Sequence, residues 1–383
     1  MSAFRRSRPR RRPAPRSSGG IATLGAALLA GALAACGYGS ESPTGSSTDN
    51  TASPAGKGGA LSADEVSIGY FANITHGTAL VGLAEDGPIR AELAGTSLKT
   101  QVFNAGPSAI EALNAGAVDI TFIGPNPAIN GYAQSGGRNL RIVAGAASGG
   151  ASLVVNPDTV DGPDDLEGKR LATPQLGNTQ DVALLNYLDG QGFEVDGESG
   201  VGDVTILRIA NAEIPPAFEN GSIDGAWVPE PTAAKLVSQG AVTALDEREL
   251  WDDGRYVVTH VIASQEFLTD HPDVVEAVIR GVVRSNARIN ENPEEAKEII
   301  NSALEELSGA ALPPEVLDPA FDHVEFLDDP LAETLSAGAD HAVAAGLLEE
   351  TDLTGIYDLR LLNKVLAEEG ESEITDDAGL GTE

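Results

Sequence analysis

Short apolar runs alternate with amphipathic stretches along most of the chain after residue 64. At 66–71, Val, Ile and Tyr alternate with small and polar residues, which is the period of a half-buried strand. At 79–84 the apolar residues instead follow the spacing of a helix. The same alternation predicts further strands, separated by helices, at 98–103, 118–124 and 140–147. Strands that alternate with helices form mostly parallel sheets covered by helices, so the pattern predicts an α/β fold.

A second block of the same kind follows, and we predict that it forms a second sheet. Its expected strands are 152–155, 168–173, 204–209 and 225–228. A β-prone run at 257–263 predicts a strand that returns to the first sheet, and the chain beyond it reads as helical to residue 368. We expect two lobes, 64–150 with 255–368 and 151–254, joined by two crossings near 147–153 and 254–261. The acidic tail, 369–383, has the composition of a disordered segment.

One strand-to-helix junction, at 172–181, combines a turn, a cap and a helix start. Gly177 suits a tight turn because glycine adopts positive φ at no steric cost. The side-chain oxygen of Asn178 or Thr179 can cap the helix that begins there, and apolar residues at 182–188 form one face of that helix. The first N–H groups of a helix lack partners within it and carry partial positive charge. The junction therefore predicts an anion site.

Polar residues also follow the other predicted strand ends, which is where ligands bind in sheets of this kind. Each of them alone is more typical of a helix cap than of a ligand contact. As a set they are candidates for one binding site, and they are His76, Asn104, Ser108 and Asn126.

Trp227 and Glu230 follow a strand of the second block and have two interpretations. An indole and a carboxylate at these places fit core packing and the first turn of a helix. Alternatively, the indole covers an apolar part of a ligand, and Glu230 accepts a hydrogen bond or pairs with an amine. The sequence leaves both interpretations open.

The acidic composition narrows the function classes. The 383 residues include 58 Asp and Glu against 24 Lys and Arg, with a formal net charge of −34. This argues against a nucleic-acid partner, because such a partner requires a basic patch. The five His form no spaced pair and there is one Cys, so we expect no metal site. Neither a P-loop nor a G-x-S-x-G motif is present. We expect a binding protein without catalytic residues or a cofactor, not an enzyme.

The beginning of the chain has the pattern of an export and anchoring signal. Seven Arg within the first 16 residues precede an apolar run at 21–35 that is too short to span a bilayer. Leu33-Ala34-Ala35-Cys36 resembles a bacterial lipobox, in which the Cys is lipidated and becomes the first mature residue. We expect a signal peptide at 1–35, lipidation of Cys36 and a flexible tether at 36–63. The Arg5-Arg6 pair is compatible with twin-arginine export, but the residues after it fit general export better.

Four stretches resemble the substrate-binding proteins of ABC importers for sulfonates, taurine, nitrate and related compounds. They are 103–120, 165–174, 215–227 and 267–272. The resemblance implies a two-lobed, periplasmic-binding-protein-like fold of type II that closes on its ligand and then docks on a permease with its ATPase. It implies a small anionic organic solute, an aliphatic sulfonate or a taurine-like compound. We expect a monomer held by its lipid anchor at the outer face of the cytoplasmic membrane.

In this family the anion lies where helix N-termini converge. The positions that match are Asn104, Gly106, Ser108, Asn126, Gly177, Asn178, Thr179 and Gln180. Trp227 and Glu230 match the polar and aromatic contacts of the second lobe, and the indole favours a ligand with an organic part. Nitrate, bicarbonate and a thiamine-pyrimidine-like compound are alternative ligands. A sensor lipoprotein and an enzyme on the same fold are alternative functions.

Overall fold

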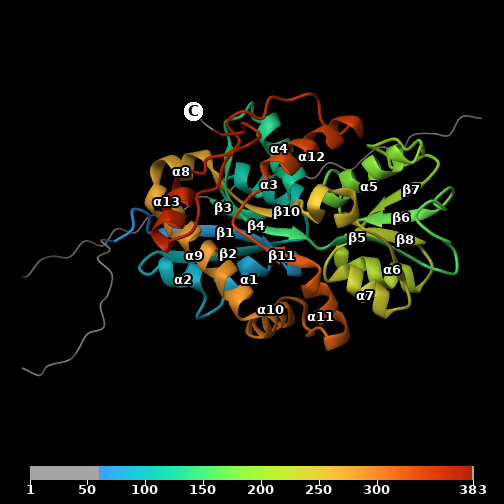
Figure 1. Ribbon diagram of the computed structural model, residues 1–383, viewed down its shortest axis with the longest axis horizontal. Coiled ribbons are helices and arrows are strands. Elements are labelled where there is room, and N and C mark those ends of the chain that lie inside the picture. Colours follow the sequence, from blue (N-terminus) through green and yellow to red (C-terminus); the bar gives the residue numbers. More distant parts are fainter. Residues whose placement is uncertain (1–59, 382–383) are drawn as a thin grey trace, which may run out of the picture. The chain divides into compact units, whose positions relative to one another are not determined.

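The strands of the protein form two separate sheets (Figure 1). The computed structural model describes residues 60–381. The first sheet, in the order β11-β4-β10-β3-β1-β2, contains β1 (Glu65–Phe71), β2 (Ser97–Phe103), β3 (Ile120–Ile123), β4 (Leu140–Gly149), β10 (Val257–Ser264) and β11 (Val324–Phe326). The second, in the order β7-β6-β8-β5-β9, contains β5 (Ala151–Val155), β6 (Arg170–Thr173), β7 (Thr205–Arg208), β8 (Gly225–Pro229) and β9 (Val242–Asp246).

Most strands within each sheet run in one direction. β1 pairs in parallel with β2 and β3, and β6 pairs in parallel with β7 and β8. β10 runs antiparallel to β3 and β4, and β5 runs antiparallel to β8 and β9. The chain enters β5 directly from the first sheet and enters β10 directly from the second sheet. No helix of the same lobe reverses the chain before these two strands, so they run antiparallel to their neighbours. Two mostly parallel sheets joined by two crossings confirm the predicted two-lobed α/β fold.

Helices connect the strands and cover the sheets (Figure 1). Those that follow strands of the first sheet are α1 (Gly77–Gly82), α2 (Pro88–Glu92), α3 (Gly106–Asn114) and α4 (Pro125–Gln134). The second sheet has α5 (Thr179–Gly190), α6 (Ile214–Glu219) and α7 (Thr232–Ser238). The chain after β10 forms α8 (Gln265–Asp270), α9 (Pro272–Glu291), α10 (Pro293–Ser308), α11 (Pro314–Asp322), α12 (Ala332–Ala344) and α13 (Arg360–Glu369).

Apolar cores lie on both faces of each sheet, which explains why the central strands read as almost continuous apolar runs. In β10, Val261 packs into one core and Ile262 into another, because successive side chains of a strand point to opposite faces. Helix α9 covers the first of these cores and buries Val274, Val278 and Val282 at helical spacing. This packing holds the strand ends that carry the candidate site in fixed positions.

The C-terminal helices contact helices of both lobes. Helix α11 packs on α7, and α12 packs on both α4 and α5, so these neighbours lie together in Figure 1. Ala345 and Leu347, just after α12, pack against the core of the second sheet. The segment 255–368, which we expect to belong to the first lobe, therefore also presents apolar side chains to the second lobe.

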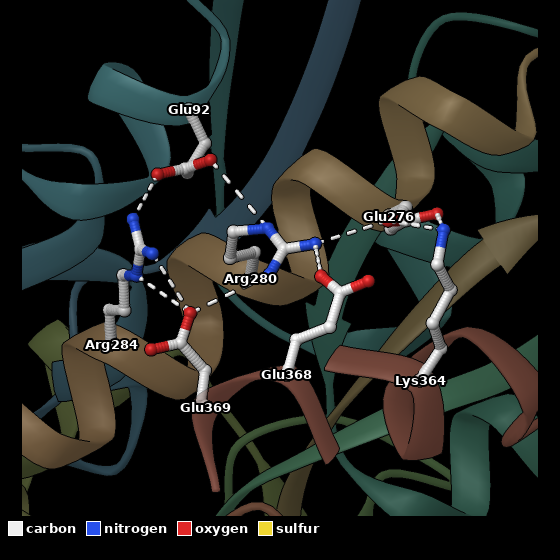
Figure 2. Close-up of polar contacts among 7 residues, drawn as sticks. All are labelled: Glu92, Glu276, Arg280, Arg284, Lys364, Glu368 and Glu369. Carbon is white, nitrogen blue, oxygen red and sulfur yellow. Dashed lines mark hydrogen bonds and ion pairs between the residues drawn. The ribbon is translucent and has the colours of Figure 1, made fainter. Parts of the chain in front are cut away.

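Seven charged residues attach α13 to the rest of the first lobe (Figure 2). Arg280 of α9 lies at the centre, with its Nη2 atom 2.6 Å from Glu368 of α13. One turn later, Arg284 pairs with Glu369 at 2.8 Å. The complete set comprises Glu92, Glu276, Arg280, Arg284, Lys364, Glu368 and Glu369. The four carboxylates and three cations tie together α2, α9 and α13.

The acidic tail differs from the expected disorder over the residues that the structure describes. Leu380 is buried, and its carbonyl oxygen accepts hydrogen bonds from the N–H groups of Gly355 and Tyr357 at 2.9 and 3.0 Å. The backbone of Ile374 exchanges two hydrogen bonds with the side chain of Asn363, at 2.9 and 3.0 Å. Two apolar residues therefore anchor a segment whose composition alone favours disorder.

The expected signal peptide, Cys36 and the tether as far as residue 59 lie outside the described residues. The last tether residues are described, and the Ser62 N–H donates to Oδ2 of Asp273 at 2.7 Å. Across residues 60–381, none of the helices combines the length and the apolar character that a membrane crossing requires.

Candidate ligand-binding site

A cavity lies between the two sheets, where strands of both come to an end. Its volume is about 20 Å³, far below that of typical small-molecule sites, so the lobes lie close together around it. The residues that line it are Phe71, Asn73, Thr75, His76, Asn104, Gly106, Gly124, Pro127, Asn178, Thr179, Gln180, Asn211, Pro229 and Val258. Most of them follow the carboxyl ends of parallel strands, as expected for a ligand site in such sheets.

Three helices begin at this cavity. Gly106 opens α3, Gly124 precedes α4, and Thr179 opens α5. Neither α3 nor α4 has a side-chain cap. The positive ends of three helix dipoles therefore face one small space, which favours a negatively charged group there.

The predicted turn before α5 forms, and a buried ion pair holds it. Gly177 has a φ of 71°, and Oδ1 of Asn178 caps the helix by accepting from the Asp181 N–H at 3.1 Å. Asp181 accepts from the Gly177 N–H at 2.9 Å and pairs with Nε of Arg208 at 2.9 Å. The Gly177 amide thus serves the turn, and the residue faces a neighbouring groove rather than the cavity.

The next two amides of this junction are available to a ligand. The N–H groups of Thr179 and Gln180 form no hydrogen bond within residues 60–381, as is usual for the first turn of a helix. Both residues line the cavity. The Gln180 side chain is held in place, since its Oε1 accepts from Nδ2 of Asn178 at 3.0 Å. This arrangement can bind an oxyanion through neutral donors.

His76 supplies a further neutral donor. Its ring is buried and lies 4.3 Å from the ring of Phe71, centroid to centroid. Burial lowers the pKa of His76 to about 3, so the ring is uncharged at neutral pH. Its Nδ1 lies 3.4 Å from the Phe71 backbone N. A backbone N–H can only donate, so Nδ1 accepts and the proton of the ring resides on Nε2.

Asn211 presents an acceptor. It begins the short 3₁₀ helix η2 (Asn211–Glu213), directly after the chain leaves β7, and it lines the cavity. Its Oδ1 atom is buried and has no hydrogen-bond partner among the described residues. Buried polar atoms of this kind are uncommon because leaving one unpaired costs about 1–3 kcal/mol.

Three of the expected site residues lie elsewhere. Ser108 is half-buried in the first turn of α3 and does not line the cavity. Nδ2 of Asn126 donates to the carbonyl oxygen of Gly338 at 2.8 Å, which ties α4 to α12. Gly177 holds the turn described above. His76, Asn104, Gly106, Asn178, Thr179 and Gln180 are the expected residues that meet at the cavity.

Trp227 and Glu230 do not line the cavity either. The Trp227 indole is fully buried against Tyr187, and its Nε1 donates to Oε2 of Glu247 at 2.8 Å. Glu230 accepts from the Ala234 N–H at 3.0 Å, and its other oxygen lies 2.8 Å from Nδ1 of His323. Of the two interpretations that the sequence left open, this geometry fits core packing and a helix first turn.

The cavity includes polar residues that the sequence-based set omitted. They are Asn73, Thr75 and Asn211. Each follows a strand, so the signal that singled out Asn104 also applies to them. Among the apolar residues, Val258 lies inside β10, and no local pattern marks it as a cavity residue.

The sequence of this chain matches a known family. A family model described as NMT1-like covers residues 59–304. The chain belongs to the NMT1-like family. It is 28% identical over 204 residues to the taurine-binding periplasmic protein of Escherichia coli, a match that covers 53% of this chain and 61% of that protein. It is also 28% identical over 148 residues to a putative aliphatic sulfonates-binding protein of E. coli, covering 38% and 44% of the two chains. The chain therefore spans less than two thirds of each of these two relatives.

Solved structures show the same fold. The alkanesulfonate-binding protein of Xanthomonas axonopodis, bound to MOPS, has a TM-score of 0.61 at 23% identity and covers 75% of this chain and 95% of its own. The nitrate-binding protein of Synechocystis has a TM-score of 0.65 at 14% identity, with 76% and 84% covered. Both neighbours are binding proteins by name, and their match confirms the expected periplasmic-binding-protein-like fold class.

Proposed function

We propose that this protein is the extracytoplasmic solute-binding protein of an ABC importer and captures a small organic anion, an aliphatic sulfonate or a taurine-like compound. The observation that carries the proposal is the meeting of three helix N-termini at one small cavity. The taurine- and sulfonate-binding relatives support the same ligand class. The protein binds and releases its solute unchanged.

In this proposal the sulfonate group lies at the start of α5. Its oxygens accept hydrogen bonds from the N–H groups of Thr179 and Gln180, from the Thr179 hydroxyl and from Nε2 of His76. Amides of Asn104 and the N-terminus of α3 at Gly106 complete the anion pole from the first lobe. The organic part of the solute contacts Phe71 and Pro229. Asn178 acts by fixing the helix start.

Binding closes the two lobes on the solute. The closed arrangement is supported by direct contacts across the cavity: the Ile74 N–H donates to the carbonyl oxygen of Glu230 at 3.1 Å, and Gly124 lies against the Thr179 side chain. Because the solute contacts residues of both lobes, it stabilises this form over an open one. The closed protein then delivers the solute to the permease and its ATPase.

We also propose that Cys36 carries a lipid that holds the protein at the outer face of the cytoplasmic membrane. The support is the lipobox-like sequence and the tether after it. Replacing Cys36 by Ser should release the protein from the membrane fraction. Equal retention of Cys36→Ser, with no lipid detected by mass spectrometry on the parent, would contradict the anchor.

A thermal-shift screen tests the ligand class, because a ligand that binds only the folded state raises the melting temperature. The panel contains alkanesulfonates, taurine, nitrate, bicarbonate and a hydroxymethyl pyrimidine. We expect the sulfonates to give the largest shifts. A shift with nitrate or the pyrimidine alone would replace the proposed ligand class.

Calorimetry on Thr179→Ala then tests the site. We expect about tenfold weaker sulfonate binding, equivalent to about 1.4 kcal/mol, from loss of one hydroxyl donor. The matched control is Thr243→Ala, an exposed Thr on β9, which should bind like the parent. Unchanged binding in both variants would move the site away from α5.

A further inference from the structure

The cavity is lined by neutral residues on all sides. Its polar members are amides, hydroxyls and the uncharged ring of His76, and its apolar members include Phe71, Pro127 and Val258. None of the described residues that line it is Asp, Glu, Lys or Arg. A charged group of a solute must therefore be stabilised here by dipoles and hydrogen bonds alone.

The charged residues closest along the chain to this lining are engaged elsewhere. Asp181, beside Gln180, bonds to Thr173 at 2.7 Å and pairs with Arg208 at 2.9 Å. Glu230, beside Pro229, uses both carboxylate oxygens, on Ala234 and His323. Neither carboxylate is left to pair with a cationic group of a solute.

The cavity nevertheless presents both donors and an unpaired acceptor. Helix N-termini and the His76 Nε2–H offer donors, which suits an anionic head group. Asn211 offers a buried acceptor, Oδ1, that no donor among the described residues satisfies. A solute donor at that place would remove the cost of an unpaired buried oxygen.

We infer that the solute is a monoanion whose tail ends in a neutral hydrogen-bond donor, a hydroxyl, and that Asn211 accepts its hydrogen bond. The inference rests on the proposed function and narrows it to hydroxyalkanesulfonates over taurine. The ammonium of taurine would lose its water and find neutral acceptors and no counter-charge. Desolvating a charge without a partner of opposite sign is costly, whereas a hydroxyl is satisfied by one acceptor.

Isothermal calorimetry at neutral pH with three two-carbon sulfonates tests the inference on the purified protein. The probes are 2-hydroxyethanesulfonate, taurine and ethanesulfonate, which differ only in the group at the tail. We expect 2-hydroxyethanesulfonate to bind at least tenfold tighter than taurine and severalfold tighter than ethanesulfonate. Taurine binding as tightly as 2-hydroxyethanesulfonate would overturn the inference while leaving the proposed function intact. If none of the three binds, the proposed function fails as well.

Asn211→Asp replaces the neutral amide by a carboxylate of nearly the same shape. A carboxylate at this position supplies the missing counter-charge, so we expect the order to reverse, with taurine at least tenfold tighter than 2-hydroxyethanesulfonate. Asn292→Asp, an exposed Asn between α9 and α10, adds the same charge far from the cavity and should keep the parent's order. If Asn211→Asp keeps the parent's order too, Asn211 does not select the tail. Melting curves of both variants confirm that each is folded.

Discussion

The Nδ1 atom of His323 lies 2.8 Å from Oε1 of Glu230. His323 joins α11 to β11, and Glu230 lies between β8 and α7. The pair therefore links a C-terminal segment of the first sheet to the second lobe, and its hydrogen bond raises the pKa of His323. A His whose pKa is raised in the folded state adds stability below its unfolded pKa, and this stability is lost as the pH rises through the folded value.

We expect His323→Gln to cost more stability in mildly acidic than in alkaline solution. The pH-dependent part should amount to at most about 1 kcal/mol, because the ring is partly exposed and solvent screens the pair. Melting curves of parent and variant between pH 5 and pH 9 measure it. His341→Gln is an informative comparison, since burial lowers the pKa of His341 and its pH effect should have the opposite sign. A parent-to-variant difference for His323 that does not change with pH would contradict the prediction.

Glu247 should make the protein less stable at higher pH. Burial raises the pKa of this carboxyl from 4.5 to about 7, despite its hydrogen bond from Trp227. The protonated form fits the folded state, so the cost of ionisation is absent below about pH 4.5, grows up to about pH 7 and then stays constant.

Glu247→Gln removes this cost and keeps an acceptor for the indole. Relative to the parent, the variant should gain up to about 3 kcal/mol between pH 4.5 and pH 8, at about 1.4 kcal/mol per pKa unit. Denaturant unfolding followed by Trp fluorescence can measure the gain. Glu219→Gln, an exposed Glu at the end of α6, is the control. A gain of equal size in the control would show that net charge, not the buried carboxyl, is responsible.

Gly124 of the first lobe lies against the Thr179 side chain of the second lobe at the cavity. A Cβ atom on Gly124 would lie 2.3 Å from Oγ1 of Thr179. Gly124→Ala should therefore oppose closure and weaken sulfonate binding at least tenfold, with little change in the melting temperature of the ligand-free protein. Calorimetry gives the affinity, and small-angle scattering gives the compaction on binding. Gly162→Ala, at a position where a Cβ meets no atom within 4 Å, should bind like the parent. If Gly124→Ala shows the affinity and compaction of the parent, the contact between Gly124 and Thr179 does not limit closure of the lobes.

Arg280 should contribute far more to stability than Lys364, although both belong to the cluster in Figure 2. The Arg280 side chain is 16% exposed and contacts four carboxylates, whereas Lys364 is 52% exposed and pairs with Glu276 alone. We expect Arg280→Met to cost about 2 kcal/mol, since Glu368 loses its partner while Glu92, Glu276 and Glu369 each keep one cation. Lys364→Met should cost less than about 1 kcal/mol. Hydrogen exchange should show faster opening of α13 in Arg280→Met. Equal costs in the two variants would argue against this ranking.

Local features of the fold can be predicted from the sequence because they depend on near neighbours. The strand predicted at 66–71 is β1, at Glu65–Phe71. The turn at Gly177 and the cap at Asn178 need only residues within four positions. The polar residues at the strand ends of the cavity follow from the same local logic, since parallel strands place their carboxyl ends together.

Roles that depend on distant partners cannot be predicted in this way. Trp227 bonds to Glu247, 20 residues away, and Glu230 to His323, 93 residues away. Asn126 donates to the backbone of Gly338, 212 residues away. In each case the side chain could bind a ligand but instead bonds to a distant residue. The two come close together only when the whole chain has folded. The ordered tail has the same origin, because Leu380 bonds to Gly355 and Tyr357, which lie beyond the reach of local sequence patterns.

Helix α12 backs both α4 and α5, and these two helices point their N-termini into the cavity from opposite lobes. Helix α12 therefore contacts both helices that carry donors, although it does not line the cavity itself. Helix α12 also lies beyond residue 304, where the match to the family model ends. Two family members with identical cavity side chains can then hold those side chains at different spacings. Under the proposed function, we expect affinity to depend on the packing of α12 as well as on the residues that line the cavity.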